Sequence, residues 1–127
     1  MSRSVELLKK RYLKNIKENP DLFIGIELEF PIVNLEGKAT DGEVVKDLFR
    51  YLPSVLGFTI EKVDDFGNPI QLFDLVSQDT ILFEVAYTTI EFAFGKAESI
   101  QEVEERFDFY MATIQTKLGE ANHAIVG

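Results

Sequence analysis

The sequence predicts a single α+β domain, with a mostly antiparallel sheet of about five or six strands and helices on one face. Two observations predict it: apolar residues recur at helical spacing in some stretches, and in others they alternate with polar residues at the two-residue period of a strand. The chain has 127 residues, of which 46% are hydrophobic and 28% charged. This is the length and balance of one ordinary globular domain, so residues 1–127 are expected to share one core.

Three segments have the spacing of amphipathic helices, namely residues 4–18, 41–52 and 99–121. Capping boxes formed by Thr40 with Glu43 and by Ser99 with Glu102 predict the starts of the second and third helices. The first segment surrounds an apolar stripe with basic residues, and such a run is typical of a solvated helix face. The stripe and its basic surround are Val5, Leu8, Tyr12 and Ile16, and Lys9, Lys10, Arg11, Lys14 and Lys17.

The charge balance and the absence of cysteine exclude several classes of function. The chain has 22 Asp and Glu against 13 Lys and Arg, a net charge of -9, which argues against a protein that binds duplex nucleic acid. It has no cysteine, so a disulfide framework, a thiolate nucleophile and a cysteine-ligated zinc are excluded. Any metal site must therefore use oxygen ligands. No membrane span or signal peptide is recognisable, and a cytoplasmic protein is expected.

The stretch FIGIELEFPIV, residues 23–33, has the alternation of a strand with one buried face. Its even-numbered residues, such as Leu28 and Phe30, are apolar and should face the core. Glu27 and Glu29 then project side by side from the opposite face, about 7 Å apart. A pair of this kind is often no more than part of a solvent-exposed sheet face.

A second acidic pair is predicted in residues 79–95, which form a hairpin in a self-consistent register. With the turn centred between Tyr87 and Thr88, every large apolar pair lies on one face. Glu84 then lies opposite Glu91 on the reverse face. The apolar pairs of this register are Val85 with Ile90, Phe83 with Phe92, and Ile81 with Phe94.

Directly opposed carboxylates need a compensating interaction. At a separation of roughly 5 Å and an effective dielectric near 20, two such charges repel by about 3 kcal/mol. Water, a proton on one member, or a cation could each relieve this repulsion. A divalent ion such as Mg²⁺, which prefers oxygen ligands and leaves positions for phosphate oxygens, fits best. The small neighbours Gly25, Ala93 and Gly95 would leave room for a ligand.

Two motifs in this order resemble a known family. GIELEF, followed by a glutamate seven residues before the glutamate of IEF, is similar to the N-terminal region of glutamate-cysteine ligase, also called γ-glutamylcysteine synthetase. The resemblance implies part of a glutamine-synthetase-like fold, whose sheet holds Mg²⁺ (or Mn²⁺) around ATP. It assigns four metal ligands, which are Glu27, Glu29, Glu84 and Glu91.

The resemblance also implies a reaction, namely ATP-dependent formation of a γ-glutamyl amide between glutamate and cysteine, the first step of glutathione synthesis. The γ-carboxylate would attack the γ-phosphate of ATP, and the cysteine amine would displace phosphate from the acyl phosphate. No side chain of this chain is expected to be catalytic, and His123 is expected to be structural. Because family members are several times longer, the chain would be an N-terminal portion, inactive without the remainder of the ligase chain.

Two alternatives stay open. The first is a non-catalytic α+β module whose acidic sheet face binds a basic partner or keeps the domain soluble. The second is a related carboxylate-amine ligase that uses an amine other than cysteine, since no motif identifies an amine pocket.

Overall fold

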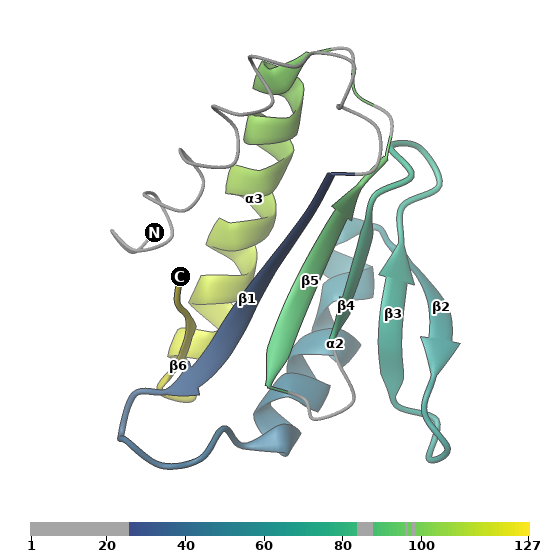
Figure 1. Ribbon diagram of the computed structural model, residues 1–127. Coiled ribbons are helices and arrows are strands. Elements are labelled where there is room, and N and C mark those ends of the chain that lie inside the picture. The colour runs from purple at the N-terminus through teal and green to yellow at the C-terminus, as the bar shows by residue number, and fades with distance from the viewer. Residues whose placement is uncertain (1–25, 84–87, 96, 98) are drawn as a thin grey trace.

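The computed structural model describes residues 26–83, 88–95, 97 and 99–127, which form a six-stranded antiparallel sheet and two helices (Figure 1). The predicted α+β class is confirmed. The elements in chain order are β1 (Ile26–Asn34), α2 (Gly42–Leu56), β2 (Thr59–Val63), β3 (Pro69–Phe73), β4 (Thr80–Phe83), β5 (Thr89–Phe94), α3 (Ile100–Gly119) and β6 (His123–Ile125). Neither described helix combines the length and apolar character needed to cross a bilayer.

The strands follow the order β2-β3-β4-β5-β1-β6, and both helices lie behind the sheet in the view of Figure 1. The core fills the space between the sheet and the helices. Aromatic rings dominate its centre: Phe30 and Phe92 each approach Phe107 of α3, with ring centroids 5.8 and 5.7 Å away. The opposite face of the sheet has neither described helix against it.

Strand β1 has the predicted alternation. Ile26, Leu28, Phe30 and Ile32 are all buried on the helix side, whereas Glu27, Glu29 and Pro31 are exposed. The strand lies between β5 and β6, so both of its edges are paired. Its period of two therefore converts one sequence stretch into one core face and one acidic face.

Helix α2 begins and ends differently from the prediction. Asp41 is the N-cap, because its side chain accepts the Glu43 N–H at 2.9 Å. Thr40 instead donates its hydroxyl to the Ile32 carbonyl of β1 at 2.7 Å, a tertiary contact that local sequence cannot encode. Pro53 lies inside the helix, which ends at Gly57 in the left-handed conformation with its N–H on the Pro53 carbonyl. The helix therefore continues past residue 52, the predicted end, and is terminated by Gly57.

Helix α3 agrees with its prediction. Ser99 accepts the Glu102 N–H at 3.1 Å as the N-cap, and the apolar stripe of the helix is buried from Val103 to Leu118. The predicted helix at residues 4–18 lies outside the described residues.

The pairing of β4 with β5 corrects the predicted hairpin by two residues. Ile81 faces Phe92, Phe83 faces Ile90, and Leu82, not Glu84, lies across from Glu91. A slip of two residues leaves every side chain on its predicted face, so the apolar pattern fits both registers equally well. Glu84 and Val85 lie outside the described residues.

A close backbone contact at Gly95 accompanies the observed register. A Cβ atom there would lie 2.5 Å from the carbonyl oxygens of both Ser77 and Gln78, just before β4. The absent side chain thus brings the end of β5 against the start of β4. The prediction that Gly95 leaves room for a ligand is wrong, because the β3–β4 loop fills that space.

The two edges of the sheet are protected in different ways. At β6, the side-chain amide of Gln115 donates to the Ile125 carbonyl and accepts the Ile125 N–H, both at 2.9 Å. Gln115 thereby replaces a neighbouring strand at that residue. At the other edge, β2 is irregular on both sides of Lys62, and such bulges disfavour pairing with another chain.

We expect Gly95→Ala to lower the free energy of unfolding by about 1–3 kcal/mol, because the new methyl group would overlap two backbone carbonyls. Urea denaturation measures the change. Gly119→Ala is the matched control: a Cβ there meets nothing within 4 Å, and alanine favours the helical conformation. Equal stability of the two variants would contradict the close contact at Gly95.

Candidate functional site

Three of the four predicted ligands lie together on the sheet face away from the helices, which we call the open face. Glu29 of β1 and Glu91 of β5 are directly paired residues across the antiparallel ladder. Glu27 lies two residues before Glu29 on the same face and pairs with Ala93. The fourth predicted ligand, Glu84, lies outside the described residues.

The three carboxylates differ in exposure. Glu27 and Glu29 are exposed, whereas Glu91 is half-buried on the central strand β5. Cβ atoms of directly paired residues lie about 4.5–5.5 Å apart, so Glu29 and Glu91 meet the condition for strong like-charge repulsion. Leu82 is the β4 neighbour of Glu91, and the small Ala93 flanks Glu27. The pairing thus gathers carboxylate oxygens beside small and apolar side chains.

In the described part of the chain, no group of three or more His, Cys, Asp or Glu side chains could hold a metal ion. Glu27, Glu29 and Glu91 therefore share a face without forming a closed cage. They present oxygen donors, the ligand type that Mg²⁺ and Mn²⁺ prefer, and a bound ion would need further ligands from elsewhere.

His123 lies away from these acids and has structural contacts. It is 3% exposed, its Nε2 accepts the Asp41 N–H at 3.1 Å, and its Nδ1 lies 2.8 Å from the Ala121 carbonyl. Nδ1 must carry the proton to donate to that carbonyl. Both ring nitrogens are thus engaged with the backbone, in agreement with the structural role predicted for this residue.

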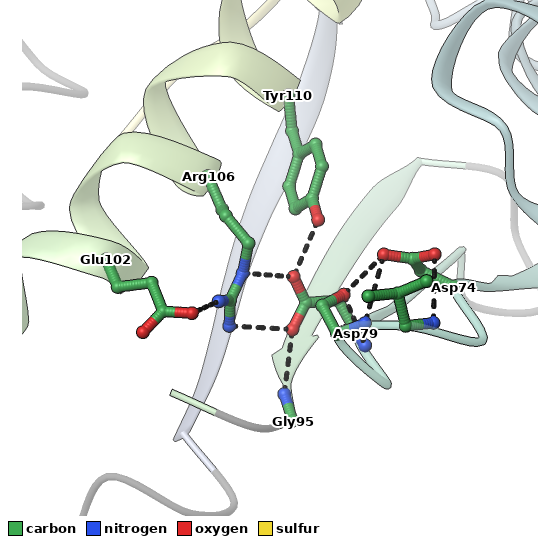
Figure 2. A network of polar contacts seen from close by, with 8 residues as sticks. Asp74, Asp79, Gly95, Glu102, Arg106 and Tyr110 are labelled. Carbon is green, nitrogen blue, oxygen red and sulfur yellow. Dashed lines mark hydrogen bonds and ion pairs between the residues drawn. The ribbon is translucent and has the colours of Figure 1, made fainter. Parts of the chain in front are cut away.

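A buried carboxylate that the sequence did not single out organises one end of the sheet (Figure 2). Asp79, which is 1% exposed, accepts the Gly95 N–H at 2.8 Å and the Tyr110 hydroxyl at 2.6 Å. Arg106 of α3 donates to both of its oxygens, from Nε at 2.8 Å and from Nη2 at 3.2 Å. Asp79 therefore joins the start of β4 to the end of β5 and to α3.

Four donated hydrogen bonds match the usual acceptor capacity of a carboxylate, so Asp79 is suited to holding structure and not to binding a ligand. Arg106 also donates to Glu102 of α3 at 2.9 Å, so its guanidinium lies between two carboxylates, those of Asp79 and Glu102. Burial raises the pKa of Tyr110 well above its ordinary value, and the hydrogen bond to Asp79 raises it further. Tyr110 is thus held as a neutral donor.

The β3–β4 loop continues this network. The Asp74 side chain accepts the Ser77 hydroxyl at 2.6 Å and the Val76 N–H at 3.3 Å. Burial alone would raise the pKa of Asp74, but the hydrogen bonds from Ser77 and Val76 outweigh it and lower the pKa below 3.8. These bonds fix the loop whose carbonyls contact Gly95.

The sequence held one signal for this network. Arg106 adjoins the buried apolar stripe of α3 and lies four residues from Tyr110 and from Glu102. A guanidinium so close to a core face requires an acidic partner. The spacing cannot identify that partner, because Asp79 lies 27 residues away in the chain.

We expect Asp79→Asn to lower the free energy of unfolding by about 3–5 kcal/mol, because it leaves Arg106 without its buried counter-charge. Urea denaturation measures the loss. Asp47→Asn is the control: it breaks an exposed ion pair with Arg50 and should cost at most about 1 kcal/mol. Similar losses in both variants would contradict a structural role for the Asp79 network.

We expect Asp74 to contribute a pH-dependent part of the stability. Because its folded-state pKa is lowered, its contribution is present above pH 3.8 and is lost as the pH falls through the folded-state value. The stability difference between the native chain and Asp74→Asn should therefore shrink on acidification. Urea midpoints between about pH 3 and pH 7 test this, and a difference that grows toward low pH would contradict it.

Comparisons of this chain with protein-family models, with curated proteins and with solved structures gave no match in any of the three.

Proposed function

We propose that this chain supplies part of the metal-binding sheet of an ATP-dependent ligase similar to glutamate-cysteine ligase, within a glutamine-synthetase-like fold. The observation that carries the proposal is the direct pairing of Glu29 with Glu91 on the open face. Both residues belong to the two motifs that resemble that family. A glutamine-synthetase-like fold also needs an antiparallel sheet with an uncovered acidic face. Here neither described helix covers the acidic face of the sheet.

The energetics of the open face support a cation. Glu29 and Glu91 repel by up to about 3 kcal/mol at an effective dielectric near 20, and Glu27 adds a third charge on the same face. A divalent ion would convert this repulsion into attraction. The half-buried position of Glu91 strengthens such an interaction, because partly buried charges are less screened by water and salt.

The residues of this chain have a binding and positioning role in the proposal. Leu28 and Phe30 alternate with the acids and are buried, which fixes the direction in which Glu27 and Glu29 project. A bound Mg²⁺ would screen the triphosphate of ATP and neutralise charge on the transferring phosphoryl group. The ATP, glutamate and cysteine pockets, with further metal ligands, would come from the remainder of a longer ligase chain.

A second function has one observation in its favour. The described residues contain no group of three acids that could hold a metal, so the open face also fits a basic partner held by dispersed charges. In that case the domain would be a non-catalytic binding module. A carboxylate-amine ligase that uses another amine differs from the first proposal only in substrate, and the metal site would be the same.

We expect Mg²⁺ or Mn²⁺ to raise the Tm of the chain, because a ligand that binds only the native state stabilises it, by about 2.7 kcal/mol at a hundred times Kd. Glu91→Gln and Glu29→Gln should each abolish the gain. ATP should add a further increase only when the metal is present. Differential scanning fluorimetry measures all of these shifts.

Glu36→Gln is the matched control, since Glu36 is exposed in the loop after β1 and forms a salt bridge with Lys38. It should retain the full metal response. The proposal fails if the metal changes nothing while Glu29→Gln and Glu91→Gln each make the domain more stable. That result would support the binding module, which polylysine should then stabilise.

A further inference from the structure

The solvent side of α3 carries a surface that the open face and the core do not use. Its residues are all exposed and lie on one side of the helix, and we call them the outer face of α3: Glu105, Asp108, Phe109, Ala112 and Thr116. Phe109 is 55% exposed, which is a large apolar surface to leave in water. The acids lie toward the N-terminal half of this face and the small residues toward its C-terminal half.

Thr113 and Thr116 make the C-terminal half of the outer face more apolar than its residue types indicate. Thr113 donates its hydroxyl to the Phe109 carbonyl at 3.0 Å, and Thr116 donates to the Ala112 carbonyl at 2.8 Å. Each hydroxyl is thereby satisfied within the helix, which leaves the methyl group for outside contacts. With Phe109 and Ala112, these methyl groups form an apolar strip beside two carboxylates.

The chain itself contains a segment of complementary chemistry. Residues 1–25 hold six Lys and Arg against three Asp and Glu, whereas residues 26–127 hold seven against nineteen. Within the basic part, residues 4–18 combine an apolar stripe with five positive charges on the remaining sides. The first fifth of the chain therefore has a positive excess of three charges, and it adjoins an acidic domain.

We propose that residues 4–18 dock on the outer face of α3. The stripe of Leu8 and Tyr12 would cover Phe109 and Ala112, and the lysines would reach Glu105 and Asp108. The covalent connection allows it: Ile26 pairs with Phe94, so β1 begins at the end of the sheet where α3 also begins (Figure 1). The eight residues from 18 to 26 span up to about 26–29 Å, which is enough to reach the helix.

The open face is the rival site, and its chemistry fits the segment less well. It offers carboxylates at Glu27, Glu29 and Glu91, but no large apolar residue of β1, β4 or β5 on that face is strongly exposed. An amphipathic helix gains most of its binding energy by burying its apolar stripe. Of these two surfaces, only the outer face of α3 places a strongly exposed aromatic ring next to acids.

Zero-length carbodiimide coupling of lysine to carboxylate in the full chain tests the proposal, with peptide mapping of the monomer by mass spectrometry. We expect Lys9, Lys10, Lys14 or Lys17 to couple to Glu105 or Asp108. Coupling within the monomer to Glu27, Glu29 or Glu91 would overturn the proposal in favour of the open face. Coupling found only in dimers would overturn it in favour of docking between two copies.

Two alanine variants provide an independent measurement. Ala112→Arg places a cation in the middle of the outer face, whereas Ala39→Arg places one on an exposed loop after β1. Arginine forms helix nearly as well as alanine, so the substitution alone should change the stability of α3 little. A larger loss of stability for Ala112→Arg than for Ala39→Arg is therefore expected only if residues 4–18 dock on the outer face. We expect Ala112→Arg to lower the Tm by about 4 °C or more and to lose the cross-links, while Ala39→Arg keeps both. Equal Tm values and equal cross-linking in the two variants would overturn the proposal.

Discussion

The pairing of β1 with β5 is the constraint on which the rest of the structure depends. Leu28, Phe30 and Phe92 are almost completely buried on one face, and each contributes roughly 1.5–3 kcal/mol through burial. Together these terms exceed the repulsion between Glu29 and Glu91, which is at most about 3 kcal/mol. The core therefore fixes which face each strand buries, and in the observed register Glu29 and Glu91 stay opposed despite their repulsion. Any compensating cation or partner acts on acids whose face apolar packing has already set.

The Asp79 network secures the same arrangement from the other side of the sheet. One carboxylate receives the Gly95 N–H, the Arg106 guanidinium and the Tyr110 hydroxyl, so the end of β5 cannot move independently of α3. Ala93, the partner of Glu27, lies two residues before Gly95 on that strand. The buried network thus supports the end of the open face nearest Glu27, although none of its members lies on that face. Its role is positional, and its saturated hydrogen bonds explain why it offers no ligand site.

The edges of the sheet are protected against further strand pairing, whereas its faces present side chains. Gln115 satisfies the outward backbone groups of Ile125, and the irregular β2 discourages strand addition at the opposite edge. Interactions with other molecules or segments are therefore favoured on surfaces, through side chains. Two such surfaces are the open face with its opposed glutamates and the outer face of α3 with Phe109. They lie on different sides of the domain and can act independently.

The sequence by itself determined which residues share a face, because the periods of strands and helices are local properties. Alternation placed Glu27, Glu29 and Glu91 opposite the core, and helical spacing identified the buried stripes of α2 and α3. Only tertiary structure decided the β4–β5 register, the use of Asp41 as the α2 cap, and the partner of Arg106. Each of these depends on contacts between distant residues: a two-residue slip preserves every face, Thr40 binds β1, and Asp79 meets Arg106 of α3 across 27 residues of chain. Local pattern gives the orientation of a side chain, whereas its neighbour across the fold is set by packing.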